Sequence, residues 1–196
     1  MMNFNLNNKS ERVLDASLKC FKQYGFKRTS VEDIAKACDM SRPALYLLFK
    51  NKTDIFRSLS QAFHAKTLQA AQVVLDADTD LQTRISNAMA ARMAPLYALA
   101  HDSAHGPELF DVNQSTSGDL NAEADDVFLH MICEALQDGI SAKVITPGPN
   151  ALTTRELAQL LLASARGLKS FAFSTQDYES LLVKSVGIFF QGLSPK

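Results

Sequence analysis

The chain has 196 residues, of which 46% are hydrophobic and 21% charged, and its formal net charge is −1 at pH 7. This composition is typical of a soluble globular protein of one or two domains with a real hydrophobic core. No apolar run approaches the roughly 18–20 residues of a membrane span, and the start of the chain lacks the apolar centre of a secretory signal. These absences argue against a membrane or secreted protein, and we expect a cytoplasmic location without membrane contact.

The charges are distributed unevenly along the chain. Residues 1–57 carry 11 basic and 6 acidic side chains, a balance of +5, whereas residues 58–196 carry 9 basic and 15 acidic side chains, a balance of −6. Such an asymmetry is typical of a protein in which one segment meets a polyanion and the remainder has a different role.

The first helix is predicted to begin near Ser10 and to end at Gly25, because glycine suits the left-handed position after a helix. Its apolar stripe recurs with helical spacing. The stripe consists of Leu14, Ser17, Leu18 and Phe21.

A second and a third helix follow at short distance. Ser30 is a good N-cap with Asp33 three residues later, close to the capping-box pattern, while Thr29 with Glu32 is an alternative frame. Residues 39–41 allow only a tight turn, and Ser41 can cap a third helix whose first turn contains a proline. Two short helices joined in this way form a helix-turn-helix.

The segment SRPALYLLFKNK, residues 41–52, predicts a third helix with two distinct faces. Leu45 and Phe49, at i and i+4, supply its inward face. The outward face suits the major groove of DNA, because Arg can bond guanine in a bidentate manner and small apolar groups can touch thymine methyls. That face consists of Arg42, Pro43, Ala44, Tyr46, Leu47 and Leu48, next to Lys50 and Lys52.

The segment GFKRTSVEDIAKACDMSRPALYLLFKNKTDIF, residues 25–56, resembles the DNA-binding signature of the TetR family of transcriptional regulators. In that signature a glycine turn, a Thr/Ser-capped helix with Ile-Ala, a turn serine and a Leu-Tyr-x-x-Phe helix precede Lys-x-Lys. The resemblance covers the first third of the chain. It implies an all-α protein with an N-terminal three-helix helix-turn-helix DNA-binding domain, residues 1–53, and a C-terminal helical ligand-binding and dimerisation domain, residues 54–196.

The resemblance also implies DNA contacts for individual residues. Phosphate contacts are implied for Ser30, Tyr46 and Lys52, with Thr29 and Lys50 as weaker candidates, and an approach to bases for Arg42, Pro43, Ala44 and Leu47. A purely structural or solvated role is the alternative for each of them. Asp39 stands where the family's turn commonly has glycine, and Leu48 replaces a frequent polar residue. The operator sequence therefore cannot be inherited by analogy.

The rest of the chain is predicted to be helical almost throughout. Thr53 is a candidate cap for a long helix that begins at Asp54. VITPGPN, residues 144–150, is a loop rich in proline and glycine. The expected helices span residues 54–75, 81–100, 106–110, 120–143, 154–173 and 176–193.

The last two helices carry more apolar surface than one subunit's core uses. In the final helix, apolar side chains cover roughly 220° of the circumference, and small residues in the helix before it allow close approach of another helix. We therefore expect a homodimer with a two-fold four-helix contact; a central helix in a single-chain bundle is the alternative. The predicted interface consists of Leu157, Leu161, Ser164, Leu168, Leu182, Val186, Phe189 and Phe190.

An effector pocket is implied by the resemblance within residues 63–143. The apolar residues predicted to line it recur with helical spacing, and such residues more often pack in a protein core than bind a ligand, so core packing is the alternative. Polar ends are offered by Arg92, His101, His105 or Arg166, and the effector itself is an unknown small molecule. The predicted pocket residues are Met89, Arg92, Met93, Tyr97, Phe110, Phe128 and Met131.

Enzymatic function finds little support in the sequence. His101 with His105, and Asp126 with His130, have the i, i+4 spacing that can hold a metal in a helical bundle, but no further ligand pattern accompanies them. Cys20, Cys38 and Cys133 form no C-x-x-C pair and are expected to be core residues. We predict no catalytic residue, no metal and no cofactor. A helical metal-binding enzyme and a protein-interaction adaptor remain the alternatives.

The predicted function is a DNA-binding transcriptional regulator. Repression is the commoner output in such proteins, so we expect a repressor that binds a palindromic double-stranded DNA operator as a homodimer. A small-molecule ligand is expected to release it.

Overall fold

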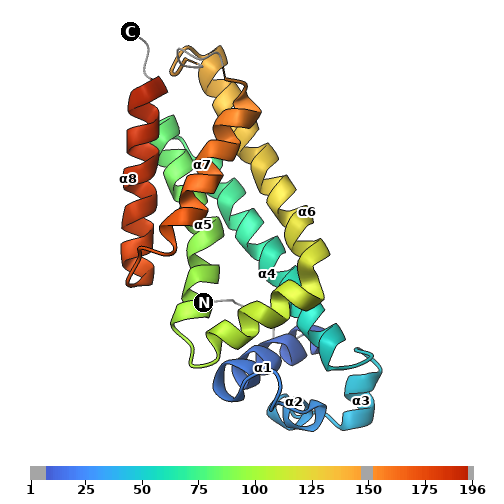
Figure 1. Ribbon diagram of the computed structural model, residues 1–196. Helices are drawn as coiled ribbons and strands as arrows, with labels where there is room; N and C mark the ends of the chain where they lie inside the picture. The colour runs from blue at the N-terminus through green and yellow to red at the C-terminus, as the bar shows by residue number, and fades with distance from the viewer. Residues whose placement is uncertain (1–7, 147–151, 194–196) are drawn as a thin grey trace. The chain divides into compact units, whose positions relative to one another are not determined.

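The computed structural model of the protein describes residues 8–146 and 152–193. This part of the chain forms eight α-helices and no strands, which confirms the all-α class (Figure 1). None of these helices is long and apolar enough to cross a membrane. The helices are α1 (Lys9–Tyr24), α2 (Val31–Ala37), α3 (Arg42–Tyr46), α4 (Lys52–Leu75), α5 (Leu81–His101), α6 (Gly106–Ser141), α7 (Thr154–Leu168) and α8 (Thr175–Leu193).

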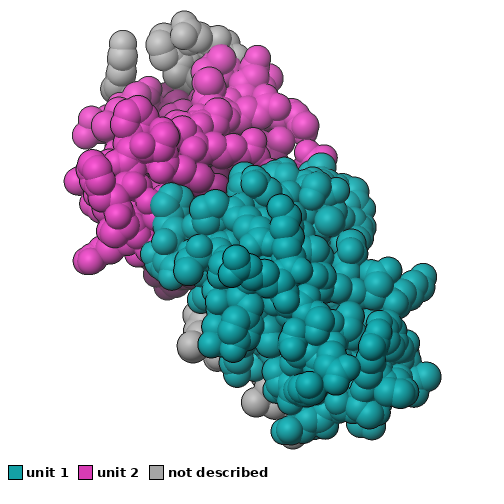
Figure 2. Space-filling model, turned by 60° about the horizontal axis from the view of Figure 1, so that its bottom comes forward, with its two compact units in different colours: residues 1–66, 99–122 teal, residues 67–98, 123–196 magenta. Residues whose placement is uncertain are grey.

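The chain divides into two compact units, drawn in teal and magenta in Figure 2. Unit 1 comprises residues 1–66 and 99–122, and unit 2 comprises residues 67–98 and 123–196. The two units are defined by contacts between residues, whereas the domains predicted from the sequence, residues 1–53 and 54–196, are defined by function. The boundary between residues 53 and 54 therefore stays a prediction.

The core of unit 1 holds the helix-turn-helix together. Aromatic rings of Phe21, Phe26 and Phe56 contact one another with centroids 5.3–5.7 Å apart. Ile34 and Leu45 are fully buried in the same core. Because burial of each such side chain is worth about 1.5–3 kcal/mol, this cluster fixes α2 and α3 on their apolar sides and leaves their other sides to solvent.

The short helices α2 and α3 begin directly after the N-cap residues predicted from the sequence. Ser30 and Asp33 form a capping box at α2, and the Ser41 hydroxyl accepts the backbone N–H of Ala44 at α3. Asp39 in the turn has φ 53°, a left-handed conformation that aspartate tolerates better than most residues.

The long helices depart from the predicted bounds. Helix α4 begins at Lys52, because the Asn51 carboxamide oxygen accepts the Asp54 N–H; the prediction of Thr53 as its cap was wrong. The predicted helices at 106–110 and 120–143 are joined in α6, which is interrupted by the non-helical backbone of Ser117. The predicted loop at 144–150 lies outside the described residues from position 147 onward.

The core of unit 2 is built by the parts of α4, α5 and α6 that belong to it, together with α7 and α8. The rings of Tyr97 and Tyr178 stack with centroids 4.8 Å apart, and their hydroxyls donate to the backbone oxygens of Ala172 and Ala165. Burial raises the pKa of Tyr178 to about 12, with the neighbouring Tyr97 adding to the shift. Both tyrosines are therefore core residues whose hydroxyl groups have hydrogen-bond partners.

Candidate nucleic-acid interface

Helix α3 is anchored on one side and exposed on the other. Leu45 is fully buried and Phe49 nearly so, whereas the side chain of Leu47 is 88% exposed. Arg42, Pro43 and Tyr46 are also exposed, and Ala44 is half-buried. The two predicted faces of the segment thus agree with the exposure of its side chains. The five residues from Arg42 to Leu47 that were predicted to contact bases or phosphate all lie on the side that faces solvent.

Arg42 and Tyr46 form one structural group on that exposed face. The Arg42 guanidinium lies 5.5 Å from the centre of the Tyr46 ring, and its Nη2 donates to the Tyr46 hydroxyl at 3.4 Å. The hydrogen bond with Tyr46 is the main reason why the pKa of Arg42 is raised above its usual value. This arrangement offers a permanently charged planar donor beside an aromatic hydroxyl, which are groups that bind phosphate oxygens or a guanine edge.

The two hydroxyl residues before α2 are placed differently. Ser30 is exposed, and its hydroxyl donates to Asp33 at 2.6 Å while it accepts the Asp33 N–H. The hydrogen bond from the Ser30 hydroxyl also lowers the pKa of Asp33. Thr29 is only 2% exposed, and its hydroxyl donates to the carbonyl of Gly25 at 2.7 Å. Only Ser30 therefore presents its side chain where a phosphate could reach it.

Lys52 is bound to the protein's own backbone. Its ammonium donates to the carbonyls of Phe26 at 2.6 Å and Thr29 at 2.7 Å, and lies 4.4 Å from the centre of the Phe26 ring. Burial lowers its pKa, against the opposing charge of Glu108. Lys52 thus has a structural role, because it fastens the turn between α1 and α2 to the start of α4. Lys50, by contrast, is exposed.

Glu108 is a residue of this region that sequence reasoning missed. Its carboxylate accepts the backbone N–H of Lys27 at 2.8 Å, and its other oxygen lies 3.6 Å from Nδ1 of His105. A side chain at Gly25 would collide with this carboxylate, and Gly25 has φ +82°. No local signal connects residues 81 positions apart, so only the fold could identify this contact.

An open cavity of about 670 Å³ in unit 1 is lined in part by Asp33 and His105. Lys19, Arg28 and Lys36 contribute its positive charges. Lys19 and Lys36 form i, i+4 ion pairs with Asp15 and Glu32, at 2.7 and 3.4 Å. Because two of the three cations are already paired with acids, this cavity has less free positive charge than its lining suggests.

The predicted pocket residues belong to two different units. Phe110 is in unit 1 and is partly exposed. The others are buried in unit 2, five of them as members of its apolar core and Arg92 as a buried cation: Met89, Arg92, Met93, Tyr97, Phe128 and Met131.

The predicted dimer residues lie mainly in the core of unit 2. Leu157, Leu161, Leu182, Val186 and Phe190 are buried there, and Leu168 and Phe189 pack against it. A second subunit cannot contact the five buried side chains without opening this core. Ser164 is exposed, and its hydroxyl bonds that of Ser185. The large apolar side chains that α7 and α8 expose are instead Leu160, Val183 and Ile188.

Within residues 8–146 and 152–193, no group of three or more His, Cys, Asp or Glu side chains is placed to hold a metal ion.

Comparison with known proteins points to one family. Residues 13–59 match the family model described as bacterial regulatory proteins, tetR family. The HTH-type transcriptional regulator YuxN of Bacillus subtilis is 34% identical over 62 residues, which are 32% of this chain and 21% of that protein. The chain thus spans about a fifth of the length of this curated relative.

Solved structures resemble the chain over nearly its whole length. A protein of Mesorhizobium loti, classed as a TetR-family transcriptional regulator, superposes with a TM-score of 0.70 at 16% identity, covering 98% of this chain and 100% of that chain. SmeT, the repressor of the multidrug efflux pump SmeDEF of Stenotrophomonas maltophilia, gives a TM-score of 0.68 at 18% identity, covering 97% and 93% of the two chains. At these identities the structural likeness concerns the fold.

Proposed function

We propose that this chain, whose residues 13–59 match the model of the tetR family of bacterial regulatory proteins, is a DNA-binding transcriptional repressor. In this proposal a small-molecule ligand releases it from a palindromic operator. It binds that operator as a homodimer in the cytoplasm. In this proposal residues 1–53 bind the DNA, and residues 54–196 dimerise and bind the ligand.

The observation that carries the proposal is the exposed flank of α3. Leu45 and Phe49 hold the helix in the core, so Arg42, Tyr46 and Leu47 can approach a base edge without disturbing the fold. Two such helices in a dimer reach successive major grooves when they lie about 34–36 Å apart. Sequence is read by the Arg42 and Leu47 side chains, and phosphates are bound by Tyr46, Ser30 and Lys50.

The dimer surface is proposed to lie on the exposed sides of α7 and α8. Leu160, Ser164 and Gly167 follow one another at i, i+4 and i+7, and Gly167 has open space beside it. Ile188 of α8 is 72% exposed, which is costly for a side chain of this size in water. Small residues flanked by large apolar ones allow two helices to approach closely.

This surface can be tested with one pair of substitutions. Ile188→Asp should convert the purified dimer to monomer, whereas Val73→Asp should not, because Val73 is similarly exposed but lies on a different helix, α4. Sedimentation equilibrium measures both. A dimer that survives Ile188→Asp would place the contact elsewhere.

A ligand-controlled repressor is supported by analogy with a structural neighbour. SmeT is the repressor of a multidrug efflux pump, and a solved structure contains its complex with triclosan. In the present chain, ligand and DNA would oppose each other through a coupling free energy of about 1–3 kcal/mol.

The proposed DNA binding is tested by selecting bound fragments from genomic DNA and measuring affinity against salt. Log affinity should fall linearly with log salt, with a slope of about 0.9 for each neutralised phosphate. Tyr46→Phe should weaken all DNA sequences similarly, since it removes a hydroxyl and keeps the ring. An adaptor that docks acidic proteins would instead bind selected and random DNA equally weakly.

A further inference from the structure

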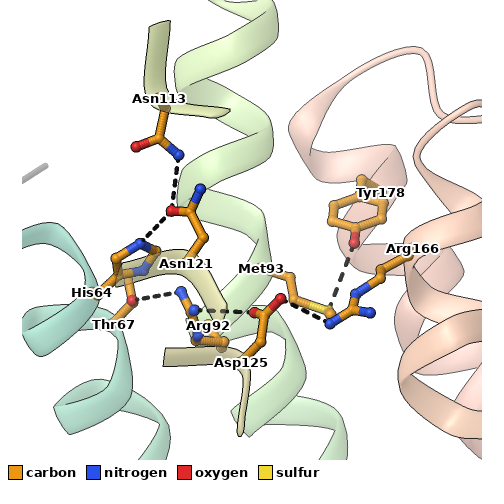
Figure 3. Close-up of polar contacts among 9 residues, drawn as sticks. All are labelled: His64, Thr67, Arg92, Met93, Asn113, Asn121, Asp125, Arg166 and Tyr178. Carbon is orange, nitrogen blue, oxygen red and sulfur yellow. Dashed lines mark hydrogen bonds and ion pairs between the residues drawn. The ribbon is translucent and has the colours of Figure 1, made fainter. Parts of the chain in front are cut away.

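In unit 2, two arginine side chains bond the carboxylate of Asp125, and a lysine adds a third positive charge that acts on them electrostatically. Arg166 of α7 donates from Nη2 to Asp125 Oδ2 at 2.9 Å, and Nη2 of Arg92 on α5 lies 3.5 Å from the other oxygen (Figure 3). Lys169, which directly follows α7, interacts electrostatically with all three groups. The cluster therefore holds three positive charges and one negative charge.

Arg92 is the buried member of this cluster. Its side chain is only 5% exposed, and its Nη1 donates to the Thr67 hydroxyl at 3.1 Å. Its Nε has no hydrogen-bond partner among the described residues. A guanidinium keeps its charge at any ordinary pH, so a buried one with an incomplete set of acceptors leaves part of its desolvation cost uncompensated.

The other charges of the cluster increase this imbalance. Burial lowers the pKa of Lys169, and the positive charges of Arg166 and Arg92 act in the same direction, against the single opposing carboxylate of Asp125. Burial likewise lowers the pKa of Arg92, with Asp125 opposing it and Arg166 adding to it. One further anion placed here would relieve the repulsion among three cations at once.

We propose that Arg92, Arg166 and Lys169 form a binding site for an anionic group, a carboxylate or a phosphate, carried by the effector. Arg166 is about half exposed and can offer its planar guanidinium to an anion from solvent, while the buried Arg92 adds a fixed positive charge on the other oxygen of Asp125. The regulatory meaning of the site rests on the proposed function, but anion binding can be measured without DNA.

The test is the thermal unfolding midpoint of the full chain with inorganic phosphate, with acetate, and with chloride at the same ionic strength. A ligand that binds the folded state raises the midpoint by an amount that grows with the ratio of its concentration to its Kd. We expect phosphate, or phosphate and acetate alike, to raise it beyond chloride. If only phosphate raises the midpoint, the site binds a phosphate group. If phosphate and acetate both raise it, the site binds a carboxylate as well as a phosphate.

Four variants locate that effect. Arg166→Gln and Lys169→Gln should each weaken anion binding about tenfold or more, since a charge-assisted hydrogen bond is lost. Arg155→Gln removes the same charge from an exposed position of α7 and should leave binding unchanged. Asp125→Asn should strengthen binding, because it removes the carboxylate that competes for the two arginines. A merely structural network would not give this opposite sign.

The outcomes separate the inference from the proposed function. Equal phosphate stabilisation of wild type, Arg166→Gln and Lys169→Gln, or no stabilisation beyond chloride, overturns the anion site. If Arg166→Gln fails to fold, Arg166→Lys, which retains the charge and should retain binding, is compared with Asp125→Asn instead. Absence of specific DNA binding by the wild type would refute the repressor and leave the phosphate result standing.

Discussion

Two arginines mark the contrast between the two units. Arg42 in unit 1 is exposed, rests over the ring of its neighbour Tyr46 and is available to an outside partner. Arg92 in unit 2 is buried, and its acceptors Thr67 and Asp125 come from two other helices. The surroundings of Arg42 come from one short stretch of sequence, whereas those of Arg92 arise only when separate helices pack together. This contrast explains why the proposed DNA-binding face can be predicted from the sequence, whereas the proposed anion site cannot.

The largest effect is expected from a pair of leucines that lie two residues apart at α3. Leu45→Ala should reduce the free energy of unfolding by about 2–5 kcal/mol, because a fully buried side chain leaves a cavity. Leu47→Ala should change it by less than about 0.5 kcal/mol, since that side chain is exposed, and should alter operator preference instead. Urea unfolding of the full chain measures both. Equal destabilisation by the two would contradict the assigned faces of α3.

A change of opposite sign is expected in unit 2. Arg92→Met keeps a similar volume and removes a buried charge, while Asp125 retains its shorter bond to Arg166. Removal of a buried charge destabilises a protein mainly when it leaves a buried partner unpaired, but Asp125 is half exposed and keeps Arg166, so the free energy of unfolding should stay unchanged or rise by about 1–3 kcal/mol. Anion-dependent stabilisation should fall at the same time. Destabilisation by several kcal/mol would show that the bonds from Arg92 to Thr67 and Asp125 outweigh the cost of burying its charge.

The exposed arginine is expected to affect recognition and leave folding intact. Arg42→Ala should cost about 1–3 kcal/mol of discrimination at particular base pairs if the guanidinium bonds guanine. Arg42→Lys is the control, because it keeps the charge and loses the bidentate geometry. Both variants are compared by binding to operators with single base-pair changes. A uniform loss across all sequences would move Arg42 from base reading to phosphate contact.

The same contrast sets how much was predictable from the sequence. Ser30, Ser41 and the Leu45–Phe49 pair act through neighbours within four residues, so their spacing alone predicted α2, α3 and the buried face. The backbone carbonyls that bind Lys52 could not be predicted from the sequence, because they lie 23 to 26 residues away, and its phosphate contact stays a prediction. Asp125 went unnoticed between two arginines 33 and 41 residues away. The apolar stripes of α7 and α8 predicted burial correctly but could not distinguish a subunit's own core from its interface.

The smallest effect concerns an exposed ion pair in unit 1, in which one arginine meets one carboxylate. Arg57 bonds both carboxylate oxygens of Asp119, at 2.8 and 2.6 Å, and this hydrogen bonding lowers the pKa of Asp119 to about 2. A carboxyl whose pKa is lower in the folded state stabilises the fold above its ordinary pKa of about 4, and this contribution is lost as pH falls through about 2. Asp119→Asn should therefore flatten the decline in stability between pH 4 and 2.

Asp111→Asn is the matched control, because it removes another exposed carboxylate from α6. Both variants are followed by urea unfolding across that pH range. Because Asp119 is itself exposed, solvent screens the pair and the difference should also shrink in high salt. A salt-independent difference would contradict a screened ion pair and would leave the bond to the backbone carbonyl of Thr116 as the main contribution of the Arg57 guanidinium.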